Sequence, residues 1–250
     1  MPQSVGLISF STDLTMPHLG ILTSRSHPTL PYLLDELAAV PGLQLTLIFD
    51  AKDFSDKDRA IFADRTLGAF PPRDTAPLFA RCACVDVPNH NDPQCLDLVR
   101  ARQIDLLLNG GTPRRVGPEL LRAAPRGVLN AHPGILPKYR GATCCEWAIH
   151  NDEPVGVTAH FMDEGLDSGP ILFPRELPIR KGMDYSAVRV ALYRLALKTA
   201  AEAVQAVFTR DLSPAKLPPQ PSGEAFKPIP DDLLAAVKRK LAAGEYQCAK

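Results

Sequence analysis

The stretch Val128-Leu129-Asn130-Ala131-His132-Pro133-Gly134-Ile135-Leu136-Pro137 decides how the chain folds. It begins as an apolar strand, and the Pro-Gly pair stops that strand at once. Residues two apart in a strand point to the same side, so Asn130 and His132 should project together at its end. The amide can donate and accept hydrogen bonds, and the imidazole can do either near neutral pH. We therefore expect a site for polar chemistry at the mouth of a sheet.

A second stretch, Gly165-Leu166-Asp167-Ser168-Gly169-Pro170-Ile171, carries the carboxylate that this chemistry needs. If Asp167 folds back beside His132, it orients the ring and favours the charged imidazolium. Such a trio suits transfer of an acyl group to an amine, because it offers donors for an oxyanion and a route for the amine proton. Each residue alone has a simpler interpretation, His132 as a structural histidine and Asp167 as a turn residue.

Working outward, apolar runs and helical periodicities alternate along the chain, as in repeated βα units. This order predicts an α/β fold with a Rossmann-like, mostly parallel sheet flanked by helices and a ligand site beyond the carboxyl ends of the strands. A polar loop is expected from Thr12 to His18, and 51–80 as loop with some helix. The predicted strands are Val5–Phe10, Leu43–Asp50, Cys82–Val87, Ile104–Leu108, Val128–Ala131, Val155–Phe161 and Pro170–Phe173. The predicted helices are Thr29–Val40, Pro93–Arg102, Pro118–Ala123, Glu146–His150, Tyr185–Phe208 and Asp231–Ala243.

The composition changes after Arg210, where six prolines lie between positions 214 and 230. Such a segment is typical of an extended linker. We expect a catalytic domain over 1–210, followed over 211–250 by a Pro-rich linker and a C-terminal helix. That helix could pair with a second copy, giving a homodimer.

Charge and cysteine usage narrow the function classes. The 28 basic and 28 acidic residues balance, so no net positive field favours a nucleic acid or an anionic membrane as partner. The six cysteines form neither CxxC pairs nor a regular disulfide framework, which predicts reduced thiols, no metal site and a cytoplasmic location. Cys144-Cys145 lies near the predicted site, but no activating partner is evident.

These motifs together resemble the folate-dependent formyltransferase family, which includes glycinamide ribonucleotide transformylase, methionyl-tRNA formyltransferase and the sugar N-formyltransferases. Residues 130–137 resemble the family's Asn-x-His-Pro-x-x-Leu-Pro, and Arg140-Gly141 the pair that follows it. Residues 163–171 resemble the loop that bears the catalytic aspartate. The resemblance covers about 80–210, and its layout is closest to the sugar N-formyltransferases.

The resemblance implies a catalytic trio of Asn130, His132 and Asp167 and N10-formyltetrahydrofolate as the formyl donor. It also implies a donor pocket lined by two loops, with residues Pro113, Arg114, Arg115 and Val116 in one and Glu164, Gly165 and Leu166 in the other. The expected mechanism is attack of an amine on the formyl carbon, with Asn130 and protonated His132 stabilising the oxyanion. Arg114-Arg115 could instead be solvated charge.

Several acceptors are compatible with this resemblance. Ser9 to Asp13 does not match the glycine-rich phosphate loop of glycinamide ribonucleotide transformylase, and the segment after Arg210 is too short for the β-barrel domain that methionyl-tRNA formyltransferases add. A small-molecule amine remains, with a nucleotide-linked amino sugar favoured over an amino acid or a hydroxylamine. A formyltetrahydrofolate hydrolase and a silent folate-binding module are the rival functions. Trp147 is expected to pack, and His18, His27 and Tyr139 are weaker candidates for contact with the acceptor.

Overall fold

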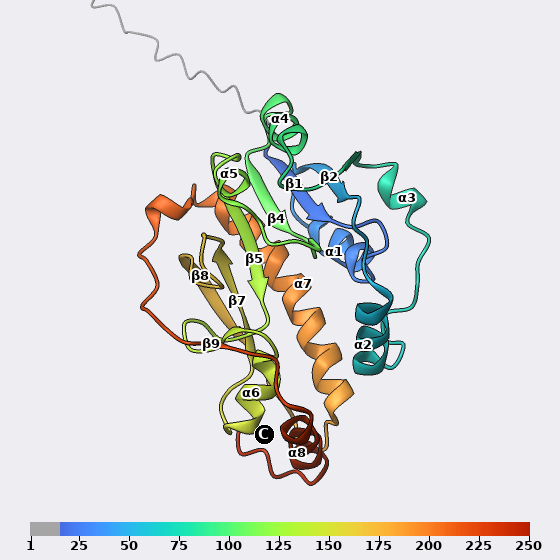
Figure 1. Ribbon diagram of the computed structural model, residues 1–250, viewed down its shortest axis with the longest axis vertical. Coiled ribbons are helices and arrows are strands. Elements are labelled where there is room, and N and C mark those ends of the chain that lie inside the picture. The colour runs from blue at the N-terminus through green and yellow to red at the C-terminus, as the bar shows by residue number, and fades with distance from the viewer. Residues whose placement is uncertain (1–15) are drawn as a thin grey trace, which may run out of the picture.

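A seven-stranded sheet organises the protein, as seen in a computed structural model that describes residues 16–250. The strand order is β3-β2-β1-β4-β5-β7-β8 (Figure 1). The first five strands in that order are parallel, and β7 and β8 run antiparallel to their neighbours. The bounds are β1 His18–Thr23, β2 Gln44–Asp50, β3 Ala83–Val87, β4 Leu106–Asn109, β5 Val128–His132, β7 Gly156–Phe161 and β8 Ile171–Glu176. The predicted mostly parallel α/β sheet is confirmed.

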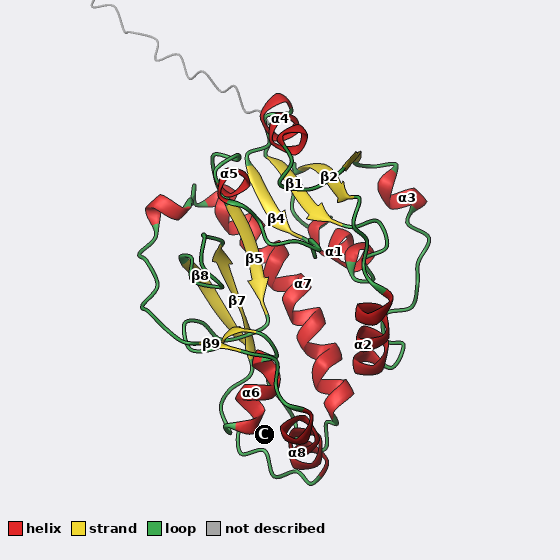
Figure 2. Cartoon of the chain, viewed as in Figure 1, coloured by secondary structure: helices red, strands yellow, loops and turns green. Residues whose placement is uncertain are grey.

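Helices cover both faces of the sheet (Figure 2). Alternate residues of one strand enter different cores: Ile21 packs with α1 and α7, whereas Leu22 packs with α4 and α5. This alternation explains why the central strands are apolar throughout, since both of their sides are buried. The helix bounds are α1 Leu30–Leu37, α2 Asp56–Thr66, α3 Ala76–Phe79, α4 Pro93–Ala101, α5 Pro118–Leu121, α6 Cys144–His150, α7 Tyr185–Thr209 and α8 Asp231–Ala242.

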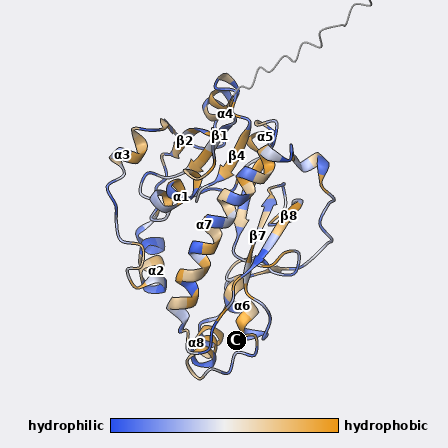
Figure 3. Ribbon diagram, turned by 180° about the vertical axis from the view of Figure 1, so that it is seen from behind, coloured by the Kyte–Doolittle hydropathy of each residue, from blue (hydrophilic) through white to orange (hydrophobic). Residues whose placement is uncertain are grey.

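Helix α7 is the longest element and crosses one face of the sheet. The stripe predicted for it is confirmed, since Val188, Leu192 and Ala203 are buried while its other side is polar (Figure 3). Asp184 caps its first turn by accepting a hydrogen bond from the amide of Ala187 at 2.7 Å. Neither α7 nor any other helix within 16–250 has the length and apolarity needed to cross a membrane.

The beginning of the sheet differs from the prediction. Strand β1 starts at His18, a residue expected in a polar loop, whereas the predicted strand Val5–Phe10 lies outside the described residues. The run His18-Leu19-Gly20-Ile21-Leu22-Thr23 was missed because Pro17 before it and the polar His18 that opens it mask a fully buried strand. The first βα loop is therefore Ser24 to Thr29, which contains no glycine. Ser9 to Asp13, compared above with a phosphate loop, lies outside the described residues.

The C-terminal segment packs on the main body rather than standing apart. It leaves the end of α7, runs outside β7 and β8, and reaches α8 (Figure 1). On the way, β9 (Ala225–Phe226) pairs in parallel with β6 (Arg140–Gly141). Val237 and Leu241 of α8 share a core with Ile149 of α6. The predicted last helix is confirmed, and the division of the chain into domains at residue 210 stays a prediction.

Candidate active site

The candidate site lies at the carboxyl ends of β4 and β5. Asn130 and His132 end β5, and the antiparallel partner β7 places His160 directly opposite Asn130. The loop after β7 then returns over the end of β5, and it carries Asp167. Both Asn109 to Val116 and Asn130 to Pro137 follow the carboxyl ends of parallel strands, where the sequence placed them.

The carboxylate of Asp167 faces the ring of His132. Its Oδ2 is 3.4 Å from His132 Nδ1, and its Oδ1 is 3.8 Å from His160 Nε2. The backbone N–H of Gly141 donates to Oδ2 at 2.9 Å. Asp167 itself has a left-handed backbone, with φ +50°, which turns the loop so that its side chain points inward. The structure thus brings together the three side chains that the sequence singled out, and their catalytic role stays a prediction.

The hydrogen bonds of His132 assign its protons. Nε2 lies 2.7 Å from the carbonyl oxygen of Tyr139, so Nε2 carries a proton and donates it. Burial lowers the pKa of His132 below its usual value, and this outweighs the opposing effect of Asp167. Asp167 thus favours the charged imidazolium, as expected, but burial outweighs it in the free protein because the ring is almost completely buried. Neutral His132 therefore presents the Nδ1 lone pair beside Asp167.

Asn130 belongs to a directed chain of hydrogen bonds. Its Oδ1 accepts from Asn109 Nδ2 at 3.1 Å, and its Nδ2 donates to His160 Nε2 at 3.1 Å. His160 Nδ1 donates to the carbonyl of Phe161 at 2.8 Å, which leaves Nε2 as an acceptor. Burial, followed by the neighbouring His132, lowers the pKa of His160 to about 4, so the ring stays neutral. This chain fixes the Asn130 amide, and its second N–H has no hydrogen-bond partner among residues 16–250.

Sequence analysis missed His160 and Asn109 as parts of this site. His160 lies in an alternating strand and carries no signal of its own, since only the antiparallel register sets it opposite Asn130. Asn109 ends β4, where the sequence placed it, but its side chain was given no role in the site. Its Oδ1 accepts from the amides of Gly111 and Thr112, and its Nδ2 donates to Asn130, which ties the loop after β4 to the Asn130 amide.

Gly134 allows the close packing beneath His132. A Cβ at this position would lie 2.6 Å from His132 Nε2 and 2.5 Å from the carbonyl oxygen of Tyr139. The glycine of the Pro-Gly pair therefore lets the chain pass directly under the ring while the Nε2 hydrogen bond is made.

The residues predicted to bind the donor occupy different surroundings. The guanidinium of Arg115 donates to the carbonyl of Glu164, and Arg122 pairs with the Glu164 carboxylate at 2.9 Å, so the two predicted loops touch.

Leu166 is 58% exposed, whereas Val116 is buried in the core beside α4 and α5. The side chain of Val116 therefore cannot line a pocket without a change in that core. Gly165 turns the loop with its N–H bonded to Asp163 at 3.0 Å.

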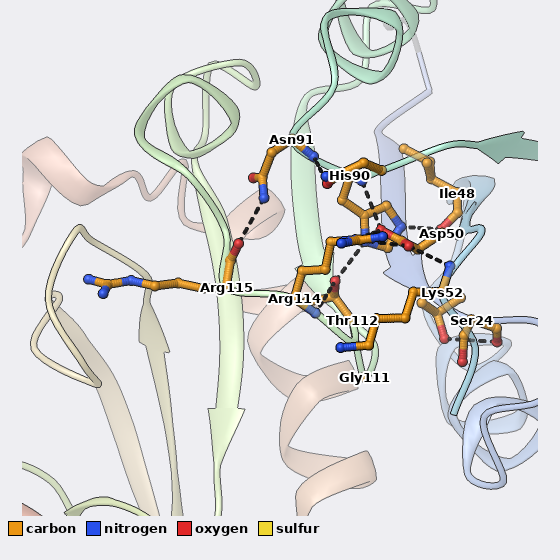
Figure 4. Close-up of polar contacts among 12 residues, drawn as sticks. Ser24, Ile48, Asp50, Lys52, His90, Asn91, Gly111, Thr112, Arg114 and Arg115 are labelled. Carbon is orange, nitrogen blue, oxygen red and sulfur yellow. Dashed lines mark hydrogen bonds and ion pairs between the residues drawn. The ribbon is translucent and has the colours of Figure 1, made fainter. Parts of the chain in front are cut away.

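Arg114 is held by a buried carboxylate, as Figure 4 shows. Its Nε donates to both oxygens of Asp50, at 3.0 and 2.8 Å. Burial raises the pKa of Asp50, but the hydrogen bonds from Arg114, His90 and Lys52 lower it more. Arg114 is thus bonded to protein, contrary to the interpretation as solvated charge. A cavity of about 450 Å³ lies beside it, and its walls include His27, Lys52, Asp53, Gly111, Thr112 and Pro113.

The weaker candidates from the sequence lie at opposite ends of the strands. His18 is buried at the amino end of β1, bonded to Arg102 and Thr46, so it lies away from the site. Tyr139 is buried and contributes only its backbone carbonyl. His27 lines the cavity beside Arg114. Trp147 packs near Phe226, as expected.

The cysteines near the site are poor nucleophiles. Burial raises the pKa of Cys144 and of Cys145 to about 12. All six cysteines are free thiols. Within 16–250 no group of three or more His, Cys, Asp or Glu side chains is arranged to hold a metal ion.

The curated relatives of this chain include methionyl-tRNA formyltransferases from several bacteria. Methionyl-tRNA formyltransferase from Syntrophus aciditrophicus (strain SB) is 36% identical over 110 residues, which are 44% of this chain and 35% of that protein. The same enzyme from Acetivibrio thermocellus (strain ATCC 27405) is 30% identical over 147 residues, 58% of this chain and 46% of that protein. The chain thus spans less than half the length of these curated relatives.

Solved structures share the fold at low identity. A sugar N-formyltransferase from Shewanella sp FDAARGOS_354 superposes with a TM-score of 0.58 and 19% identity, covering 86% of this chain and 78% of that one. The formyltransferase PseJ from Anoxybacillus kamchatkensis, solved with UDP-4,6-dideoxy-4-formamido-L-AltNAc and tetrahydrofolate, gives 0.53 and 18%, with 82% and 100% coverage. At these identities the likeness concerns the fold.

The family assignment comes from the sequence itself. The formyl transferase family model matches residues 54–204, which is more than half of the chain and includes Asn130, His132 and Asp167. With the site geometry and the shared fold, this match establishes that the chain belongs to the formyl transferase family.

Proposed function

We propose that this protein is an N-formyltransferase that moves a formyl group from N10-formyltetrahydrofolate to the amine of a small acceptor. The observation that carries the proposal is the 3.4 Å approach of Asp167 Oδ2 to His132 Nδ1, beside an Asn130 amide whose second N–H bonds to none of the described residues. This arrangement provides a hydrogen-bond donor for the oxyanion and an acceptor for the amine proton in one place.

The proposed mechanism uses each of the three groups once. The acceptor amine attacks the formyl carbon, and the free N–H of Asn130 donates to the oxygen that becomes negative. The amine proton passes to the Nδ1 lone pair of His132, directly or through one water. The Asp167 carboxylate, 3.4 Å from Nδ1, then faces an imidazolium and stabilises the charge that the transfer creates. When the tetrahedral intermediate collapses, the bond from carbon to N10 breaks and the proton returns to that nitrogen.

The donor is proposed to bind against the loops after β4 and β7. The backbone amides and carbonyls of these loops are the groups we expect to read a pterin ring, with Arg114 held in place by Asp50. Pro113, Arg115, Val116, Glu164, Gly165 and Leu166 complete the proposed donor loops. Because Arg115 contacts the Glu164 carbonyl, a ring that enters between the loops takes the place of that contact.

For the acceptor we propose a nucleotide-linked amino sugar. The cavity beside Arg114 lies between the loops after β1, β2 and β4, where the strand order reverses and α/β proteins usually bind ligands. Its volume of about 450 Å³ suits a small molecule, and Lys52 adds a cation for a phosphate. The loop after β1, Ser24 to Thr29, has no glycine to cradle the phosphate of a glycinamide ribonucleotide. An amino acid or hydroxylamine acceptor is the alternative within the same chemistry.

Methionyl-tRNA is the second candidate acceptor, because the two curated relatives described above are methionyl-tRNA formyltransferases. The balanced charge of the chain disfavours it, since binding a nucleic acid depends largely on basic side chains. Hydrolysis of the donor to formate is a rival that needs no amine.

A panel assay separates these acceptors. The protein is incubated with N10-formyltetrahydrofolate and, in separate reactions, nucleotide-linked amino sugars, amino acids, hydroxylamines and methionyl-tRNA, while tetrahydrofolate and formylated product are quantified. We expect amine-dependent turnover with one of the small acceptors. If methionyl-tRNA alone were formylated, it would be the acceptor in place of the amino sugar. If formate were released at full rate without any amine, the reaction would be hydrolysis and not transfer.

The protonation state of His132 gives a first prediction. Burial lowers its pKa while Asp167 raises it, so we expect the ring to titrate below 6.5 and at a still lower pH in Asp167→Asn. Activity requires the neutral ring in the proposed mechanism, so the rate should fall as the pH decreases through that pKa. The measurement is NMR titration of the His132 ring, assigned with His132→Gln. Titration above 6.5, or an upward shift in Asp167→Asn, would contradict the assignment.

A further inference from the structure

The C-terminal segment reaches the catalytic loop through a single glutamine. Residues 217–226, which we name the strap, run from the end of the η1 turn (Pro214–Lys216) to β9. Gln220 lies in the strap, and its Nε2 donates to the carbonyl of Asp167 at 3.2 Å and to the carbonyl of Gly169. One side chain thus holds both ends of the turn that presents the Asp167 carboxylate.

A buried arginine fixes which way the Gln220 amide faces. Arg140 is only 6% exposed, and its Nη2 donates to Gln220 Oε1 at 3.0 Å and to the carbonyl of Pro221 at 2.6 Å. Since a guanidinium can only donate, the amide oxygen must face Arg140 and the amide nitrogen must face the two carbonyls. The amide therefore cannot rotate by 180° without losing bonds on both sides.

The same strap also supports the opposite side of the carboxylate. The next residue after Arg140 is Gly141, whose N–H donates to Asp167 Oδ2 while its backbone pairs with Phe226 of the strap. Gly141 has φ +91°, and a Cβ there would overlap the carbonyl of Phe226. The backbone and the side chain of Asp167 are consequently both tied to the strap, one through Gln220 and the other through Gly141.

From these contacts we infer that Gln220, oriented by Arg140, is a positioning residue for Asp167. It does not touch the reacting atoms, and it acts by holding a loop whose left-handed residue would otherwise be free to turn the carboxylate away from His132. The inference rests on the proposed function, because it assumes that Asp167 takes part in catalysis. It gives the segment after α7 a role in the reaction.

The test compares Gln220→Ala and Gln220→Glu with Ser222→Ala, an exposed strap position used as a matched control. We expect both Gln220 variants to lose roughly 10- to 100-fold in kcat with little change in KM, because small displacements of a catalytic group have effects of that size. Gln220→Glu keeps the acceptor for Arg140 but points an oxygen at two carbonyls, so it should be no better than alanine. Ser222→Ala should match the parent protein.

A double-mutant cycle distinguishes positioning from a general loss of structure. In an Asp167→Asn background, Gln220→Ala should cause less than a twofold further loss of kcat, since the group that it positions is already gone. Additive losses, or full activity in Gln220→Ala, would overturn the inference while leaving the proposed function intact. Full activity in Asp167→Asn would instead remove the proposed role of Asp167. Thermal unfolding of each variant identifies any that fail to fold.

Discussion

Alanine at Asn130, His132 or Asp167 is expected to lower kcat by at least about a hundredfold. Asn130→Ala removes the only side-chain donor proposed for the oxyanion, and loss of one such donor typically costs about 100- to 1000-fold. His132→Ala removes the proton acceptor, whose contribution is of similar size. Asp167→Ala leaves the buried imidazolium without its carboxylate at the moment that it forms. Single-turnover assays with the acceptor found in the panel are the measurement.

The controls for these variants are chemically matched. His150→Ala removes a histidine at the end of α6, and Asp232→Ala removes an exposed carboxylate in the first turn of α8. Both should retain the parent rate, and the three site variants should keep their cooperative unfolding. Substantial activity in Asp167→Ala would take that residue out of the mechanism, and the strap would then lose its proposed target.

The second large effect concerns stability. Glu146 is completely buried in α6, where Tyr185 donates to it at 2.6 Å and Arg189 and Arg65 approach to 3.5 and 3.8 Å. Glu146→Ala leaves the guanidinium of Arg189, itself only 5% exposed, without its partner. Removing one member of a buried ion pair typically costs about 3–5 kcal/mol. Urea denaturation should show that loss in the free energy of unfolding.

An exposed pair provides the comparison. Glu202 pairs with Arg175 at 2.9 Å on the surface of α7 and β8, with both side chains partly solvated. Glu202→Ala should therefore cost less than about 1 kcal/mol, as is usual for surface pairs. Equal losses in Glu146→Ala and Glu202→Ala would show that the α6–α7 charge cluster does not hold the elements beneath the site together. Because α6 also carries Cys144, which together with His132 Nε2 surrounds Gly134, we expect loosening of α6 to reduce activity as well.

Local sequence predicted most elements because their patterns are strong and short in range. The β2, β4 and β5 strands are apolar runs bounded by glycine, proline or asparagine, and α7 has a long amphipathic stripe. The strand His18 to Thr23 was not predicted, because its first residues follow a proline and were assigned to a polar loop, and only its pairing with both β2 and β4 identifies it. The predicted strand Val5–Phe10 lies outside the described residues.

The site was predictable in part for a similar reason. Asn130 and His132 share a strand, so their common side follows from the two-residue period, and the motif around Asp167 identified the third residue. No comparable sequence pattern identifies His160 or Gln220 as part of the site. His160 depends on the register of an antiparallel pair, and Gln220 approaches Asp167 from 53 residues further along the chain.

The sequence by itself determined the α/β alternation, the apolar strands and the three polar side chains at the ends of two of them, because each of these follows from neighbours along the chain. Tertiary structure alone decided the protonation of His132, the direction of the Asn130 amide and the hold of the strap on Asp167. These features depend on burial and on hydrogen bonds between distant segments. Both exist only once the sheet has formed and the C-terminal segment has packed against it.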